Sequence, residues 1–93
     1  LAAGFTVSGS PSGDKMNALM TMFVLAAQQG MIWVGLGETP GNENGINRLG
    51  GYIGAMGQAG QESVDIAPNR EDKLTGEALG RRVAEITNLF HRK

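Results

Sequence analysis

The fold is decided by the stretch AAGFTVSGSPSGDKMNALMTMFVLAAQQGMIWVGL, residues 2–36. It opens with the short apolar run 2–7, which is stopped abruptly by the turn-forming residues 8–14. It closes with a second continuous apolar run, residues 31–36, rich in β-branched and aromatic side chains. Short apolar runs bounded by turn residues are typical of strands that are buried on both faces. Both runs are therefore predicted to be strands of a parallel sheet.

Between these runs the apolar side chains recur at helical spacing. They are Met16, Leu19, Met20, Phe23, Val24 and Ala27. Asp14 stands where a helix N-cap is expected, and Gly30 stands where a left-handed glycine commonly ends a helix. Strand, helix and strand together predict a parallel βαβ unit with a right-handed crossover.

A long polar loop, residues 37–51, follows this unit and contains the turn dipeptides Pro-Gly and Asn-Gly. Residues 52–56 are compatible with a short strand or with more loop, and residues 57–70 are predicted to be loop. Loops of this size in a compact domain are usually functional or disordered. The middle of the chain is therefore where a ligand or a partner is expected.

A last helix is predicted to begin within residues 68–75. Its apolar stripe is Leu79, Val83, Ile86 and Phe90. The spacing of Gly76 and Gly80 would let this helix approach a sheet closely. Because parallel sheets are covered on both faces, two such strands need further strands beside them. We therefore expect an α/β, doubly wound domain of which residues 1–93 form only one half.

The composition excludes several classes of function. The 93 residues are 41% hydrophobic and 18% charged with a net charge of -1, which is typical of a globular domain and unlike a nucleic-acid module. There is no cysteine and one histidine, so thiol chemistry and a multi-histidine metal site are excluded. No segment has the length and apolarity of a membrane span or a secretory signal. We expect a cytoplasmic protein with no metal, nucleic-acid or membrane partner.

The loop at residues 8–14, here called the serine-glycine loop, is the first candidate ligand site. In open α/β sheets, ligands bind beyond the carboxyl ends of the strands, and this loop follows the first predicted strand and opens a helix. Its small residues, main-chain N–H groups and serine hydroxyls suit polar or anionic ligand atoms. A plain strand-to-helix turn explains these features equally well. Lys15 is out of frame for a phosphate-binding loop of the Walker type, and Ser10 lacks the flanking glycines of a hydrolase nucleophile.

Other candidate residues favour structural roles. Gly51, Gly54, Gly57 and Gly60 form a repeated glycine pattern, which we interpret as a packed turn because the strand and helix of a dinucleotide site are lacking. Trp33 is expected in the core, whereas Tyr52 could either pack or stack on a planar ligand. The carboxylates in or beside loops are expected to be solvated; these are Asp14, Glu38, Glu43, Glu62 and Asp65.

Several strings in the sequence resemble one family. They are GFTVSGSPSGDK (residues 4–15), QQGMIWVGL (28–36), NRLG (47–50), GAM (54–56) and LGRRVAE (79–85). In this order they resemble the C-terminal half of flavodoxin-like proteins of the WrbA type, which are FMN-dependent NAD(P)H:quinone oxidoreductases related to NADPH-dependent FMN reductases. The resemblance implies a five-stranded parallel sheet, of which residues 1–93 would supply strands four and five and the last two helices.

The resemblance also implies a cofactor and a reaction. FMN would receive a hydride from NAD(P)H and pass electrons to a quinone-type acceptor, in a homo-oligomer that is a tetramer in that family. No side chain of this chain would be catalytic. The positions that correspond to cofactor-binding positions of the family are Ser8, Gly9, Ser10, Pro11, Ser12, Gly13 and Gln28. The alternative is a non-catalytic flavodoxin-like electron carrier or assembly module.

Two departures from the family pattern affect these expectations. Gln28 and Gln29 stand where the family often has histidine, and glutamine can donate hydrogen bonds but does not titrate near neutral pH. Pro11 stands where the family often has glycine and lacks an N–H donor. The family's FMN phosphate loop follows its first strand, which has no counterpart among residues 1–93. We therefore expect these residues alone to bind FMN weakly and the complete protein to be the active form.

Overall fold

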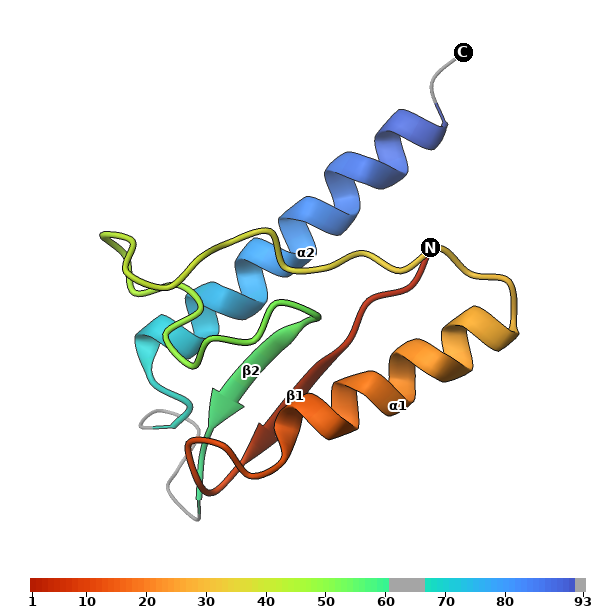
Figure 1. The fold of residues 1–93 in the computed structure, drawn as a ribbon. Helices are drawn as coiled ribbons and strands as arrows, with labels where there is room; N and C mark the ends of the chain where they lie inside the picture. Colours follow the sequence, from red (N-terminus) through yellow and green to blue (C-terminus); the bar gives the residue numbers. More distant parts are fainter. Residues whose placement is uncertain (61–66, 92–93) are drawn as a thin grey trace.

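The computed structural model describes residues 1–60 and 67–91 of the chain. Four elements follow one another along it (Figure 1). They are strand β1 (Phe5–Ser8), helix α1 (Lys15–Gln28), strand β2 (Ala55–Gln58) and helix α2 (Arg70–Phe90). The architecture is α/β, as predicted, with a different second strand.

β1 and β2 form a parallel two-stranded sheet in which Phe5 pairs with Ala55 and Ser8 with Gln58. The two helices lie on opposite sides of it (Figure 1). On the α1 side, Leu19 is fully buried against the close approach of Gly4 and Gly54. On the other side the core consists of Leu36, Ala55 and Leu79, with Val83 packed against them. Helices on both faces of a parallel sheet are the layers expected of a doubly wound fold.

Residues 31–36 were predicted to be a strand, but they do not form one. They do run parallel to the first strand, as predicted. Only Trp33 makes a parallel bridge, with Ala2. The Ala2 N–H donates to the Ile32 carbonyl at 2.8 Å, and the Val34 N–H donates to the Ala2 carbonyl at 2.8 Å. Beyond that point the segment leaves the first strand and enters the long loop.

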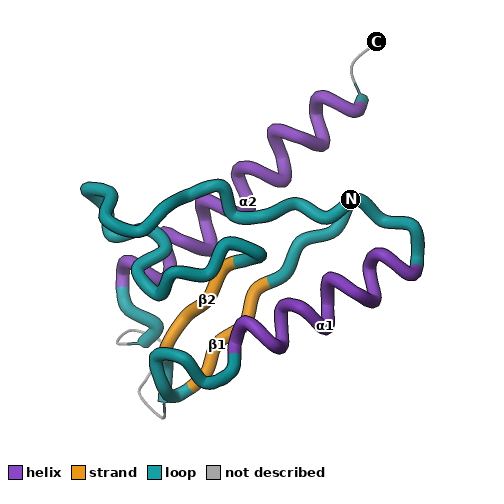
Figure 2. The backbone as a smooth tube through the Cα atoms, in the orientation of Figure 1, coloured by secondary structure: helices purple, strands orange, loops and turns teal. Residues whose placement is uncertain are grey.

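The chain returns to the same edge through residues 52–58. Leu36 N–H donates to the Tyr52 carbonyl at 3.0 Å, and Ala55 N–H donates to the Gly4 carbonyl at 3.1 Å. Residues 31–36 and 52–58 therefore occupy successive stretches beside one strand, and the long loop is inserted between them (Figure 2). The first stretch was predicted to be a full strand but makes only one bridge, whereas the second stretch, predicted to be short strand or loop, contains β2.

The expected burial of the first strand on both faces is also wrong for the described residues. Phe5 is 71% and Val7 47% exposed. Phe5 and Val7 are paired with Ala55 and Gly57 of β2, and no described strand pairs with the other edge of β1. This strand therefore has more apolar side chains than the described residues bury.

The residues that helix α1 buries differ from the predicted apolar stripe. Leu19 is buried as predicted, but Met16, Met20, Phe23 and Val24 are each at least 38% exposed, and Lys15 and Ala26 are buried instead. Gly30 ends the helix as predicted: it has φ 75°, and the N–H groups of Gly30 and Met31 donate to Ala27 and Ala26. Asp14 stands at the N-cap, but its backbone is left-handed and its side chain makes no capping bond.

Helix α2 begins at Arg70, within the predicted window. The Asn69 side chain caps it by accepting from the Asp72 N–H at 2.9 Å. Its stripe is buried at Leu79 and ends in an exposed Phe90. Gly76 and Gly80 do not serve close packing, contrary to expectation, because a methyl group on either would meet no atom within 4 Å.

The glycines at 51, 54 and 57 serve close packing, as interpreted from the sequence, but they lead into β2 or lie in it and do not form a turn. The prediction of loop from residue 57 is wrong for residues 57–58, which belong to this strand. A Cβ on Gly54 would overlap the Gly4 carbonyl oxygen, and one on Gly51 would overlap the Met56 side chain. These glycines let residues 51–57 lie tightly against the first strand and its neighbours.

Candidate functional site

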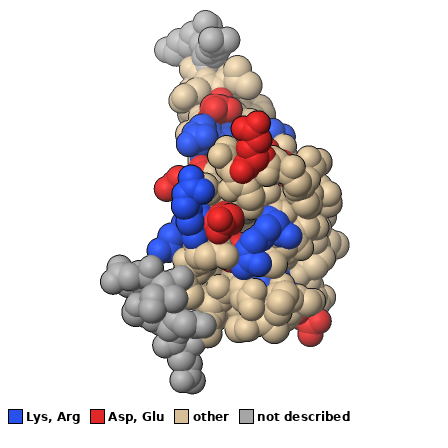
Figure 3. Space-filling view, turned by 90° about the vertical axis from the view of Figure 1, so that its left-hand side faces the viewer, with Lys and Arg blue, Asp and Glu red and all other residues tan. Residues whose placement is uncertain are grey.

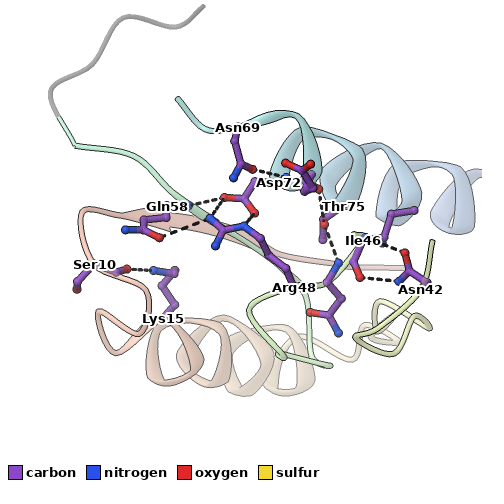
Figure 4. Close-up of polar contacts among 11 residues, drawn as sticks. Ser10, Lys15, Asn42, Ile46, Arg48, Gln58, Asn69, Asp72 and Thr75 are labelled. Carbon is purple, nitrogen blue, oxygen red and sulfur yellow. Dashed lines mark hydrogen bonds and ion pairs between the residues drawn. The ribbon is translucent and has the colours of Figure 1, made fainter. Parts of the chain in front are cut away.

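The serine-glycine loop leaves the carboxyl end of β1 and turns into α1 around one buried lysine. Lys15 is 1% exposed, and its Nζ donates to the Ser10 carbonyl oxygen (Figure 4) and to Ser8 Oγ. Ser8 Oγ also donates to the Ser10 carbonyl oxygen at 3.1 Å, and Lys15 N–H donates to the Ser12 carbonyl oxygen at 3.0 Å. The carbonyls of the loop are therefore directed inward, toward the start of the helix.

The backbone of the loop reverses through two consecutive left-handed residues, Gly13 at φ 55° and Asp14 at φ 53°. A Cβ on Gly13 would overlap Ser8 Oγ. Gly13 is thus required both by its dihedral angle and by the closeness of the Ser8 hydroxyl.

Main-chain donors of the loop remain available. Within the described part of the chain, the N–H groups of Ser10, Ser12 and Gly13 have no acceptor. Pro11 between them has no N–H, and the Ser8 hydroxyl predicted as a ligand donor is engaged within the loop. The loop therefore offers main-chain N–H groups, beside a helix N-terminus, to electron-rich atoms of a ligand.

The long loop is ordered by the side chain of Asn42. Its Oδ1 accepts from the N–H groups of Asn44 and Ile46 at 3.1 and 2.9 Å, and its Nδ2 donates to the carbonyl oxygens of Thr39 and Ile46 at 2.9 and 2.6 Å. One asparagine thus holds residues 39–46 in a compact turn, as Asx-type bonding commonly does.

A second asparagine ties this loop to α2. Asn47 is 2% exposed and left-handed, with φ 60°. Its N–H donates to Thr75 Oγ1 at 2.8 Å, and its Nδ2 donates to the Glu38 carbonyl oxygen at 2.8 Å. Thr75 Oγ1 in turn donates to the Glu71 carbonyl oxygen at 2.8 Å, so the contact is fully satisfied within the buried site.

Arg48 forms the next anchor. Its Nε and Nη2 donate to Asp72 Oδ1 and Oδ2, both at 2.9 Å, in a bidentate ion pair (Figure 4). Asp72 Oδ2 also accepts from the Gln58 N–H at 2.9 Å, at the carboxyl end of β2. One buried carboxylate therefore connects the long loop, β2 and the first turn of α2.

These anchors bring the two predicted loops to one cavity of about 450 Å³. Pro11, Ser12 and Met16 lie on one side of it and Arg48, Leu49 and Gly50 on the other. The cavity combines the loop at the carboxyl end of β1 with the anchored end of the long loop, which is the position expected for a ligand site in an open α/β sheet.

Gln28, the remaining predicted site residue, is not near this cavity. It is exposed at the last position of α1. The helix is 14 residues long, which separates its ends by roughly 20 Å. Its role toward a cofactor stays a prediction that would require another subunit.

The two aromatic candidates also lie away from the cavity. Trp33 packs edge-on against Phe23, with ring centroids 5.7 Å apart, and its indole N–H donates to the Ile53 carbonyl oxygen at 2.8 Å. Trp33 therefore has packing contacts, but it is half-buried and, contrary to expectation, is not one of the buried core residues. Tyr52 is 54% exposed and precedes β2, at the opposite end of that strand from Gln58.

The charged side chains on the face shown in Figure 3 are of mixed sign. Among the predicted solvated carboxylates, Asp14 and Glu43 are exposed and Glu38 is half-buried, while Glu62 and Asp65 lie outside the described residues. Residues 1–60 and 67–91 contain no group of three or more metal-ligating His, Cys, Asp or Glu side chains. Over the same residues, neither helix has the length and apolarity needed to cross a membrane.

The sequence interpretation missed the three charged residues that shape the site. Lys15, Arg48 and Asp72 were not singled out for any role in binding or positioning. The pattern Asn69-x-x-Asp72 before an apolar stripe is typical of a helix start and could have located the Asp72 carboxylate there. Nothing in the sequence pairs Arg48 with Asp72, because the loop between them has no regular period.

Comparison with known proteins agrees with this geometry. The chain is 39% identical to the flavodoxin FldP of Pseudomonas aeruginosa (strain UCBPP-PA14) over 93 aligned residues, which cover 95% of this chain and 50% of that protein. This chain is similar to half of a flavodoxin. No family model matches the chain, and no solved structure matches it. The similarity and the parallel sheet between two helices support a flavodoxin-like α/β fold.

Proposed function

We propose that this chain belongs to an FMN-binding redox protein of flavodoxin-like fold and that its serine-glycine loop contacts the flavin. The observation that carries the proposal is the set of available N–H groups on Ser10, Ser12 and Gly13, in a loop whose residues Pro11 and Ser12 line a cavity of about 450 Å³ at the carboxyl end of β1. The similarity to a flavodoxin supports it independently.

The residues present suit one part of such a cofactor. Main-chain N–H groups can donate to the carbonyl oxygens and ring nitrogens of a flavin, and the Met16 and Met56 side chains beside the cavity offer apolar contact to a ring. Bound FMN would supply the hydride and electron chemistry. The chain would bind and orient the ring and exclude water from it, with no side chain acting as a general acid or base.

The phosphate of the cofactor would be held elsewhere in the complete protein. The chain spans about half the length of the relative that it matches. The unpaired edge of β1, with Phe5 and Val7 largely exposed, supports the addition of further strands there. We propose that residues 1–93 form the C-terminal half of a single flavodoxin-like domain.

For the complete protein, the finer proposal is hydride transfer from NAD(P)H through FMN to a quinone-type acceptor. The WrbA-type strings of the sequence support it, whereas the similarity to a flavodoxin favours an electron carrier. The two are distinguished by steady-state reduction of a water-soluble quinone with NADH and with NADPH. Turnover supports the enzyme; retention of FMN without turnover supports the carrier.

A homo-oligomer, a tetramer in the WrbA-type family, is part of the same proposal and rests on that resemblance. In it Gln28 would reach the flavin of a neighbouring subunit. Size-exclusion chromatography with light scattering measures the number of subunits. The Gln28→Ala variant then tests the contact of Gln28 with the flavin. We expect weaker FMN binding in an oligomer, and an unchanged dissociation constant would exclude the contact.

The proposed cofactor is tested by titrating the complete apoprotein with FMN and following the quenching of flavin fluorescence. Saturable quenching at micromolar FMN is the expected result. The same titration of residues 1–93 alone should give much weaker quenching. Absence of saturable quenching in the complete protein would refute the flavoprotein assignment.

A further inference from the structure

Lys15 has an unusual environment for a lysine. It is the first residue of α1 and is 1% exposed, although most lysines keep the ammonium group in water. Its Nζ donates to Ser8 Oγ at the carboxyl end of β1 and to the Ser10 carbonyl oxygen in the serine-glycine loop. A side chain from the helix therefore holds the Ser10 carbonyl of the loop (Figure 4).

The positive charge of Lys15 is not neutralised by a nearby carboxylate. In the described part of the chain, no Asp or Glu oxygen lies within ion-pair distance of its Nζ. The charge is stabilised by a hydroxyl and a carbonyl dipole instead. Because a buried charge is screened far less than an exposed one, it acts on atoms bound at the adjoining loop.

The contact also decides which groups the loop offers to a ligand. Lys15 holds the Ser10 carbonyl oxygen inward, so this oxygen does not repel electron-rich atoms of a ligand. The N–H groups of Ser10, Ser12 and Gly13 stay available to those atoms. Loss of the ammonium would free this carbonyl to rotate, because among the described residues only the Ser8 hydroxyl, at 3.1 Å, would still donate to it.

We propose that Lys15 is the positioning residue of the cofactor loop and that its buried charge raises the reduction potential of the flavin bound there. This inference rests on the proposed FMN site. A reduced flavin carries more negative charge than an oxidised one, so a nearby weakly screened cation stabilises the reduced form. Lys15 would thus control both affinity and potential through the loop, without taking part in bond making.

The test compares Lys15→Met, which keeps the length and removes the charge, with Lys15→Arg, which keeps the charge. Lys73→Met, at an exposed lysine of α2, is the matched control. For Lys15→Met in the complete protein we expect about a tenfold or larger rise in the FMN dissociation constant, from the loss of charge-assisted hydrogen bonds. The midpoint potential should become more negative. Lys15→Arg should restore the potential, and Lys73→Met should change neither quantity.

Ser8→Ala provides a second variant in case Lys15→Met does not fold. It removes one acceptor of the ammonium but retains the charge, so it should weaken FMN binding and leave the potential unchanged. Wild-type affinity and potential in folded Lys15→Met would overturn the inference, as would a wild-type dissociation constant in Ser8→Ala. Failure of the wild-type protein to bind FMN would instead overturn the proposed function and this inference with it.

Discussion

Arg48 and Asp72 lie 24 positions apart in the sequence and form a bidentate ion pair with both N–O distances at 2.9 Å. The Asp72 side chain is 1% exposed and the Arg48 side chain 33%. Asp72 also accepts from the Gln58 N–H, so its two oxygens have protein donors. This arrangement fixes the end of the long loop that lines the cavity, and it links cavity shape to the start of α2.

Removal of Arg48 should therefore lower the free energy of unfolding by more than the loss of a surface ion pair does. Arg48→Met leaves a buried carboxylate with two hydrogen bonds fewer, and we expect the free energy of unfolding to fall by about 2 kcal/mol. Urea unfolding followed by circular dichroism measures it. Asp72→Asn and the double variant complete a cycle, and the double variant should lose less than the sum of the single losses. Strict additivity would show that the pair contributes no coupling.

The Thr75 hydroxyl should be needed because the buried Asn47 N–H has no other acceptor among residues 1–60 and 67–91. Thr75→Val keeps the shape of the side chain and removes this acceptor, which should lower the free energy of unfolding by about 1–2 kcal/mol. Thr75→Ser keeps the hydroxyl and is the control, with a smaller loss expected. A Thr75→Val protein as stable as the wild type would show that the hydroxyl and its hydrogen bond are not needed.

The elements with local patterns could be predicted from the sequence, and those defined by distant partners could not. The two helices and the Gly30 terminus follow from apolar spacing and from a left-handed glycine, which are properties of neighbouring residues. The second strand was misplaced because residues 31–36 and 52–58 share one edge of the first strand. Residues 31–36 are the more apolar stretch, but they make only one bridge to it. Apolar side chains such as Phe5 are exposed because no described strand pairs with the outer edge of β1.

The same distinction holds for the candidate site. The serine-glycine loop could be found because it follows an apolar run and precedes a helical period. Its internal support could not, because a lysine in the first turn of a helix is commonly solvated and only the structure shows Lys15 buried under the loop. Arg48 and Asp72 belong to a loop and a helix start, and only the return of residues 52–58 to the sheet brings them together.

Gly76 and Gly80 should be positions where alanine stabilises the protein. Both lie within α2, are exposed, and have room for a methyl group. Because alanine is the better helix former, each substitution should raise the free energy of unfolding by about 0.5–1 kcal/mol. Gly54→Ala is the contrasting control and should destabilise by about 1–3 kcal/mol, since its Cβ would overlap the Gly4 carbonyl oxygen. Thermal unfolding separates these outcomes, and destabilisation by Gly80→Ala would show that another part of the protein packs there.

Gly13 and Gly9 allow the proposed cofactor loop to be tested by one methyl group at a time. Gly13 is left-handed and its Cβ would overlap Ser8 Oγ, whereas a Cβ on Gly9 would meet only the Ala59 carbonyl oxygen at 3.9 Å. Gly13→Ala should distort the loop that Lys15 supports. We expect an FMN dissociation constant higher by about tenfold, from the strain of a left-handed alanine and the displaced Ser8 hydroxyl.

Gly9→Ala should leave the loop conformation intact and change FMN affinity by much less than Gly13→Ala. Fluorescence titration of both complete proteins with FMN makes the comparison, and circular dichroism confirms that both are folded. If Gly13→Ala binds FMN as tightly as the wild type while folded, the loop does not contact the flavin. If Gly9→Ala alone loses binding, the flavin approaches the start of the loop, and the contact moves from the N–H groups of Ser12 and Gly13 to the residues that directly follow β1.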